Sequence, residues 1–307
     1  AQGSLDDIDL VRRIEYQPAV YGGLPSSVNV VRMVSVDDDL YMLDGNTGNV
    51  YHAALTEQGY VLDGTFLCGP GTLGVENRLI DIMPWPVGFE PMASLVAIDA
   101  QGNVVYCQPG QEPLTSEFAS PPTSSLSGLT GFTMDQSNMF LLDPQANSVW
   151  IYWGSETDSQ PDPFFADQIP RLDDVVDLMI ANNELYLLHE DGQLAICEYS
   201  SLEIAPTKCK EPVPFVDSRQ ARENMIITPT SPFSQILYNP PPDPSLFVLQ
   251  PDSRSINLFS LRTPTYQTQY QPIAQLEGNE ATAFAVDPID RLMYLALGNH
   301  VYYGRIP

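Results

Sequence analysis

Charged and polar residues interrupt several short apolar runs of this sequence, and these are the positions where chemistry is most readily placed. Arg32 lies within Val-Val-Arg-Met-Val, Asp177 lies within Val-Val-Asp-Leu-Met, and Asp81 and Gln235 hold similar places in two further runs. A charged group inside an apolar strand needs a partner or water. One cation, two carboxylates and an amide around one point would hold a metal cation or a small polar ligand. The alternative is that Arg32 pairs with Asp81 or Asp177.

No standard catalytic or metal-binding motif accompanies these residues. The sequence lacks Gly-x-Ser-x-Gly, His-Glu-x-x-His, a P-loop, a dinucleotide fingerprint and any Cys-x-x-Cys spacing. His52, His189 and His300 fall at non-equivalent points of the chain, and no pattern brings them together. We therefore predict no catalytic residue and no cofactor, and we leave the metal unassigned. Calcium is the cation that the carboxylates would favour.

A second candidate site is aromatic and lies in loops. Trp85 falls in a proline-rich loop, and Phe164 and Phe165 follow a polar stretch. With Trp150 and Trp153, such rings would offer a platform for a sugar or a peptide, because aromatic side chains combine a broad apolar face with a polar edge. The alternative is that these rings pack between elements of the core.

A strand pair joined by a tight turn recurs six times, and these pairs are the elements that would position the candidate residues. Each copy has an apolar run, a turn rich in Gly, Asn, Asp or Pro, and a second apolar run with aromatic residues. Another apolar run precedes each pair, and a more polar stretch follows several of them, at intervals of roughly 50 residues. Four strands per repeat of this length are typical of a propeller blade.

We therefore predict a single all-β domain over residues 1–307, a six-bladed β-propeller with four-stranded blades. The inner strands of a propeller line its central channel, and aligning them gives one residue per blade, with two choices in the last: Arg32, Asp81, Gly131, Asp177, Gln235, and Thr282 or Phe284. The last repeat has no room for an outer strand after Tyr303. Leu10–Tyr16 is expected to supply that strand and close the ring. A β-sandwich or two smaller β domains are the alternatives.

The four cysteines fit two disulfides. Cys197 and Cys209 fall on the third and fourth strands of the fourth blade, and adjacent antiparallel strands bring Cα atoms within disulfide reach. Cys68 and Cys107 end strands of the first two blades, so that they are able to bridge neighbouring blades. Disulfides indicate an exported protein, outside the cell or on its surface. Four buried free thiols in a cytosolic protein are the alternative.

The charge balance excludes some partners. The chain has 13 basic and 39 acidic residues and a net charge of −26, which argues against nucleic acid, because binding it requires basic patches. No apolar run is long enough to insert into a membrane, and no signal-peptide pattern is present. Ala1–Ser4 resembles a trimmed or engineered start. We expect the domain to be monomeric.

Four stretches resemble a family of bacterial propeller ectodomains: Leu142–Trp150, Phe164–Pro170, Leu185–Gly192 and Pro240–Leu246. In that family, the propeller follows a transmembrane segment and a cytoplasmic domain that resembles metal-dependent serine/threonine phosphatases. The resemblance covers essentially the whole chain. It implies a sensing or interaction role outside the cell, with the signalling enzyme elsewhere in the parent polypeptide, and it supplies no catalytic motif.

The leading functional hypothesis is a non-enzymatic propeller that binds a protein or a small polar or glycan ligand outside the cell. The alternative is a calcium-dependent hydrolase or lyase with its site at the central channel, although Arg32, Gly131 and Gln235 supply few anionic ligands. A purely structural surface module is a third hypothesis, and it would have no saturable site. A fold alone does not decide between these functions.

Overall fold

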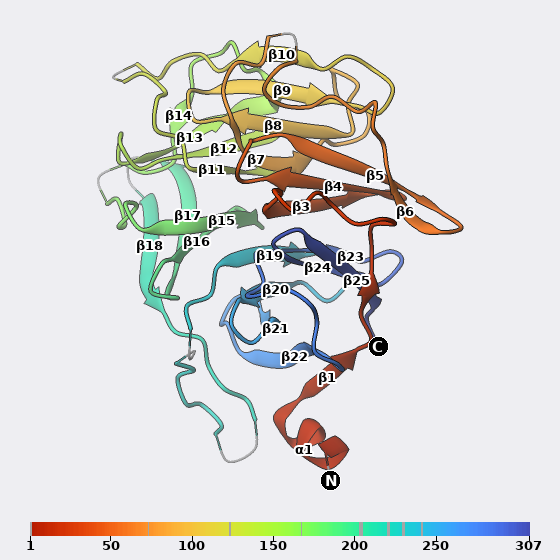
Figure 1. Cartoon of the computed structure of the whole chain (residues 1–307). Coiled ribbons are helices and arrows are strands. Elements are labelled where there is room, and N and C mark those ends of the chain that lie inside the picture. The colour runs from red at the N-terminus through yellow and green to blue at the C-terminus, as the bar shows by residue number, and fades with distance from the viewer. Residues whose placement is uncertain are drawn as a thin grey trace.

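A computed structural model of the chain describes residues 2–72, 74–122, 124–166, 168–202, 205–219, 222–228, 231–240 and 242–307. Its strands form six small antiparallel sheets arranged around a central axis, as predicted (Figure 1). The structure is therefore a six-bladed β-propeller, in which each blade begins with an inner strand at the axis and ends with an outer strand.

The strands of the first three blades follow one another in chain order from the inside outward. Blade 1 contains β3 (Val30–Val36), β4 (Asp39–Asp44), β5 (Val50–Thr56) and β6 (Gly59–Leu62). Blade 2 contains β7 (Leu79–Pro84), β8 (Leu95–Asp99), β9 (Asn103–Cys107) and β10 (Leu114–Glu117). Blade 3 contains β11 (Gly131–Asp135), β12 (Asn138–Asp143), β13 (Ser148–Tyr152) and β14 (Asp162–Pro163), and the short 3₁₀ helix η1 (Trp153–Ser155) lies between its last two strands.

The last three blades differ more from one another. Blade 4 contains β15 (Val175–Ala181), β16 (Glu184–His189), β17 (Leu194–Leu202) and β18 (Ala205–Val213). Blade 5 contains β19 (Gln235–Asn239), β20 (Ser245–Gln250), β21 (Ser255–Ser260) and β22 (Tyr266–Pro272). Blade 6 contains β23 (Ala283–Asp287), β24 (Leu292–Leu297) and β25 (His300–Arg305), and its outer strand comes from the N-terminus.

The N-terminal segment closes the ring, but not through the residues predicted. β1 (Val11–Ile14), within the expected strand Leu10–Tyr16, pairs in parallel with β22 and adds a fifth strand to blade 5. The outer strand of blade 6 is instead β2 (Gln17–Pro18), which pairs with β25. Val20 then forms a bridge to Tyr60 in blade 1. The segment therefore runs along three consecutive blades and ties the two ends of the ring together.

A helix that the sequence did not predict precedes this segment. α1 (Gln2–Asp9) lies outside the ring below blade 5, next to β1 (Figure 1). Arg222, from the long connection between β18 and β19, forms an ion pair with Asp9 at the end of the helix. No helix in the described part of the chain has the length and apolarity needed to cross a membrane.

The apolar core lies between the blades. Six buried clusters each combine residues of two neighbouring blades, such as Phe215 and Phe259 between blades 4 and 5. Each sheet therefore buries both faces, which explains why its central strands are apolar along their whole length instead of alternating. This packing makes a rigid ring whose inner strands meet at the axis.

Candidate functional site

The polar residues predicted to share the channel lie together at the centre of the ring. Arg32 on β3 donates from Nε to Oδ1 of Asp81 on β7 at 2.9 Å. Its terminal nitrogens donate to both carboxylate oxygens of Asp177 on β15, at 3.0 and 2.7 Å. Blades 1 and 4 stand opposite each other, so this bidentate pair spans the axis, and Asp81 holds the arginine from a neighbouring blade.

Backbone N–H groups complete the hydrogen bonding of both carboxylates. Asp81 accepts from the N–H of the residue that follows it and from Phe132 N on β11, at 2.9 and 3.2 Å. Asp177 accepts from the residue that follows it and from Ile236 N on β19, at 3.0 and 2.7 Å. Every oxygen of the two carboxylates therefore has a donor. The bonds from Phe132 N and Ile236 N also connect β11 and β19 to the carboxylates.

Gln235 extends the network to the remaining blade. Its Nε2 donates to Val31 O at 3.2 Å, and its Oε1 accepts from Phe284 N at 3.0 Å. Phe284 therefore provides the blade 6 contribution, whereas Thr282 precedes β23 and donates to Ala296 O. All six inner strands belong to one hydrogen-bonded network, and we call Arg32, Asp81, Asp177 and Gln235 its ionic layer.

Gly131, the blade 3 member of the alignment, leaves room for this network. A Cβ at this position would lie 3.3 Å from Leu178 Cδ2 and 3.4 Å from Asp81 Oδ2. A larger side chain would therefore press on the carboxylate that accepts from Phe132 N. The sequence placed this glycine correctly, and the structure shows that it serves the approach of Asp81.

Burial and mutual attraction set the protonation of the ionic layer. Asp81 and Asp177 have side chains 2% exposed, and that of Arg32 is 15% exposed. Burial alone would lower the pKa of Arg32, but Asp177 and Asp81 together raise it above its ordinary value. Burial raises the pKa of Asp81, against the opposing effect of Arg32. The arginine is thus held charged, with Asp177 as its bidentate partner.

An apolar cavity of about 270 Å³ adjoins the ionic layer on one side. Arg32 and Asp177 line its polar end. Its opposite end is lined by residues near the ends of inner strands, among them Pro84, Tyr238 and Val286, so the cavity extends toward the turns that join each inner strand to the second strand. Two residues of the ionic layer, Arg32 and Asp177, are therefore the floor of a cavity on this face of the ring.

The wall of the cavity is a second ring of residues, one per blade, each two positions beyond the aligned residue of its inner strand. We call this ring the apolar layer, and it consists of Val34, Met83, Thr133, Met179, Leu237 and Val286. Sequence reasoning missed it. Period-two spacing in strands was the available signal, but an apolar residue in an apolar run does not stand out from the core.

The aromatic residues predicted for loop binding are buried. Trp85 is 2% exposed and packs against Tyr106, with ring centroids 4.9 Å apart. Phe164 and Phe165 are 1% and 4% exposed and belong to the core between blades 3 and 4. Packing, the alternative role considered for these rings, accounts for their positions. The binding of a partner by the loops around them remains a prediction.

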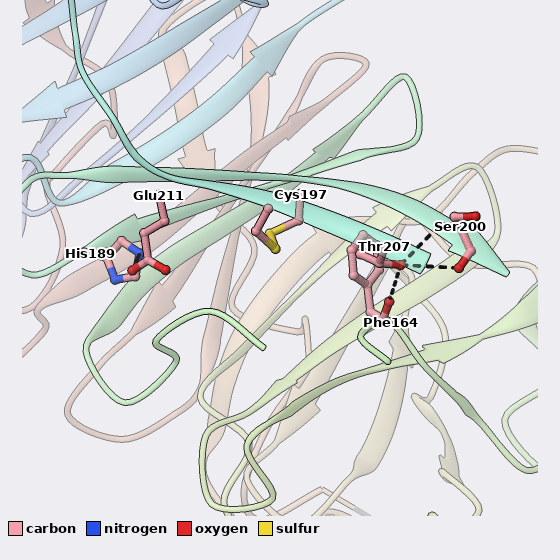
Figure 2. The surroundings of a disulfide bond; sticks show 7 residues. Phe164, His189, Cys197, Ser200, Thr207 and Glu211 are labelled. Atoms are coloured by element: carbon pink, nitrogen blue, oxygen red, sulfur yellow. Dashed lines mark hydrogen bonds and ion pairs between the residues drawn. A yellow bond between two sulfur atoms is a disulfide. The ribbon is translucent and has the colours of Figure 1, made fainter. Parts of the chain in front are cut away.

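Both predicted disulfides are present. Cys68–Cys107 joins the connection after β6 to the end of β9, so it links blades 1 and 2, with Cα atoms 5.9 Å apart. Cys197–Cys209 joins directly paired residues of β17 and β18, with Cα atoms 4.0 Å apart. Figure 2 shows this second disulfide midway along the two strands, with His189 and Glu211 to one side and Thr207 to the other.

The described residues were searched for side chains arranged to hold a metal ion. Within the residues that the structure describes, no group of three or more His, Cys, Asp or Glu side chains has the arrangement of a metal site. In the channel, the carboxylate oxygens that a calcium ion would use already accept hydrogen bonds from Arg32 and from backbone N–H groups. A cation there would have to displace the guanidinium of Arg32.

A comparison with known proteins finds a solved structure that is similar to this chain in fold. No protein family model matches the chain, and no curated protein matches its sequence. Among solved structures, it is similar to PorZ, described as an essential bacterial surface component of the type-IX secretion system of Porphyromonas gingivalis. The TM-score is 0.48 and the identity 12%, over 95% of this chain and 39% of that chain. At this level, the likeness carries no argument about function.

Proposed function

We propose that the chain is an extracellular binding propeller whose ligand occupies the apolar cavity of the central channel. The observation that carries this proposal is the contrast within the channel. The ionic layer satisfies its own charges, whereas the adjoining apolar layer encloses about 270 Å³ that no side chain fills. Concave, largely apolar cavities with a few fixed polar groups are the usual form of small-molecule sites.

The floor of the cavity defines the polar part of the ligand. A guanidinium has five N–H donors, and three of those of Arg32 go to Asp81 and Asp177. In the described part of the chain, the other two have no acceptor, and Arg32 lines the cavity. The carboxylate oxygens already have donors. The floor therefore offers donors to a ligand and needs an acceptor from it.

The charge of the protein around the cavity determines which acceptor group the ligand should carry. One guanidinium and two carboxylates give the ionic layer a formal charge of −1, and the whole chain carries −26, so an anionic ligand is disfavoured. A cation would face the outward N–H groups of Arg32. A neutral carbonyl or amide satisfies the donors without adding charge. We therefore propose an apolar ligand that carries one such group at its end.

The proposed location outside the cell is supported by the two disulfides, which persist in oxidising compartments. A sensor role within a larger polypeptide belongs to the same proposal. It is supported by the resemblance of stretches such as Leu185–Gly192 to the propellers joined to phosphatase-like domains. In such a protein, ligand occupancy of the channel would be the input that the propeller receives.

The test uses an apolar dye with one carbonyl, Prodan, whose emission shifts to the blue when it leaves water. We expect saturable one-site binding to the wild-type protein. Val286→Phe, which fills the cavity from a half-buried position on β23, should weaken binding at least about tenfold. Val61→Phe, on the outer strand β6 and outside the cavity, is the matched control and should bind like the wild type.

The same titration tests the acceptor. The naphthylamine that lacks the propionyl carbonyl should bind more weakly than Prodan, because the Arg32 donors are then left unpaired. 2-Naphthoate should also bind more weakly, because the ionic layer beside the cavity has a formal negative charge. Equal binding of Prodan by the wild type and by Val286→Phe would overturn the proposed site. An order of affinities with naphthoate first would overturn the proposed ligand class.

A further inference from the structure

A second hollow, away from the channel, lies where blades 3 and 4 meet at the periphery of the ring. It has a volume of about 450 Å³, and its lining includes Asp162, Phe164, Tyr199, Ser200 and Ser201. The blades differ here in the length of their last strands. β14, the outer strand of blade 3, has two residues, whereas β17 and β18, the last two strands of blade 4, have nine each.

The two sides of this hollow are fixed to one another. Thr207 on β18 donates to Phe164 O of blade 3 at 2.9 Å and accepts from Ser200 N at 3.1 Å (Figure 2). The Cys197–Cys209 disulfide holds the same two strands a few residues away. A ligand would therefore meet a preformed wall, which reduces the entropy lost on binding.

Trp153 contacts two residues of the lining, Asp162 and Tyr199, and among the described residues it is the one exposed indole. It is 41% exposed, whereas Trp85 and Trp150 are 2% and 6% exposed. It follows the end of β13 and precedes Gly154, which adopts a φ of +66°. Its Nε1 donates to Asp162 Oδ2 at 2.8 Å, and its ring lies 5.8 Å from that of Tyr199 at an angle of 58°. The ring is thus held in one orientation.

The hollow and the adjoining indole together offer the apolar faces and the polar groups that a sugar ring requires. The face of Trp153 is able to pack against the C–H face of a pyranose, and Tyr199 gives a second, tilted wall. The Asp162 carboxylate uses one of about four lone-pair sites for the indole, so the rest are able to accept hydrogen bonds from sugar hydroxyls. The hydroxyls of Ser200 and Ser201 add donors and acceptors.

Other ligand classes fit less well. A purely apolar ligand would leave Asp162 and the serine hydroxyls without partners, which is unfavourable. A quaternary ammonium needs aromatic faces on two sides of it. Here the rings of Trp153 and Tyr199 already contact each other, so no space remains between them for a cation.

We propose that this hollow, lined by Asp162, Tyr199, Ser200 and Ser201, binds a pyranose unit of a polysaccharide together with the adjoining indole of Trp153. The site is independent of the central cavity and uses residues of different blades. It assigns a role to the blade 3 loop that is separate from the packing role of Phe164 and Phe165.

The test measures retardation in native gels that contain dextran, laminarin, mannan, xylan or galactan, with titration of tryptophan emission by the polysaccharide that retards the protein. We expect at least one of the five to retard the wild type and to shift the emission, because Trp153 is the exposed indole. Trp153→Ala should weaken binding at least about tenfold, and Trp153→Phe should restore it to within about threefold.

Two further variants separate the proposed contacts from general surface effects. Asp162→Asn keeps an acceptor for the indole but loses the carboxylate, and should weaken binding by about three- to tenfold. Tyr21→Ala removes an aromatic side chain that is 63% exposed elsewhere on the surface, and should bind like the wild type. Absence of retardation by all five polysaccharides, or equal binding by the wild type and Trp153→Ala, would overturn the proposal.

Discussion

The ionic layer and the apolar layer of the channel lie only two residues apart on the same six strands, yet they have opposite roles. In the ionic layer, Arg32 binds two carboxylates, and backbone N–H groups occupy the oxygens that remain. In the apolar layer, residues such as Met83 and Leu237 surround an unfilled volume. Charged residues around an axis therefore do not by themselves make a site. The groups of the ionic layer bind one another and hold the ring together, and the unfilled space beside them is where we propose that the ligand binds.

The largest expected effect comes from breaking the ionic layer. Arg32→Met leaves two buried carboxylates without their cation and should lower the free energy of unfolding by about 3–5 kcal/mol. For a chain of this length, that corresponds to a melting temperature lower by about 6 °C, measured by circular dichroism. Arg171→Met, which removes a 46%-exposed arginine from surface ion pairs, is the matched control and should change stability by less than about 1 kcal/mol.

A combined variant sharpens this result. Adding Asp81→Asn and Asp177→Asn to Arg32→Met removes the uncompensated charges, and should recover at least half of the lost stability. Similar stability of Arg32→Met and Arg171→Met would contradict the structural role of the ionic layer. The charged groups of the ionic layer would then be hydrated and would contribute little to stability.

A smaller effect is expected in the pH dependence of stability. Burial raises the pKa of Asp81 above 3.8, so the folded state binds this proton more tightly than the unfolded chain does. The stability that protonation of the Asp81 carboxyl contributes is fully present below pH 3.8. It is lost as the pH rises through the raised pKa of the folded state. Asp81→Asn should therefore lose less stability than the wild type as the pH rises from about 4 to 7, measured by urea unfolding.

Asp44 has a pKa shift opposite in direction to that of Asp81. Burial would raise its pKa, but hydrogen bonds from Asn29 N, Thr47 and Asn46 N lower it below 3.8. Its contribution is present above pH 3.8 and is lost as the pH falls through the lowered pKa. Asp44→Asn should therefore cost more stability at pH 7 than at low pH. Parallel pH profiles for the Asp44 and Asp81 variants would argue against different environments for the two carboxylates.

The smallest expected effect concerns calcium. Because Arg32 and backbone N–H groups already occupy the carboxylate oxygens, EDTA or millimolar calcium should move the melting temperature by less than about 1 °C. A site saturated at a hundred times its Kd would stabilise the protein by about 2.7 kcal/mol and shift the midpoint by several degrees. Such a shift, if Asp81→Asn with Asp177→Asn abolished it, would favour the calcium-dependent hydrolase or lyase instead.

Much of the fold could be predicted from the sequence because the blades repeat. Inner strands such as Val30–Val36 were identified from apolar runs, and the alignment brought Arg32, Asp81, Asp177 and Gln235 together correctly. The closing strand was misplaced because Gln17–Pro18 has only two residues and no alternating pattern. Val11–Ile14 has a pattern, but nothing local indicates that its partner is the parallel strand β22.

The sites were harder to predict than the fold because burial is a tertiary property. Phe164 and Trp153 are both aromatic residues of the same loop region, yet one is 1% exposed and the other 41%. The charged residues of the ionic layer could be identified in the sequence because they interrupt apolar runs. The cavity beside it is made by the separation of six backbones, and no single residue encodes that separation.

The most direct test of the central claim is a crystal structure of the protein soaked with Prodan. We expect electron density for the dye in the cavity beside the ionic layer, with its carbonyl oxygen within hydrogen-bonding distance of the guanidinium of Arg32. The Arg32–Asp177 pair should be unchanged in that structure. Dye bound elsewhere with the cavity unoccupied, or Arg32 withdrawn from Asp177 to admit it, would contradict the division of the channel into a structural floor and a binding wall.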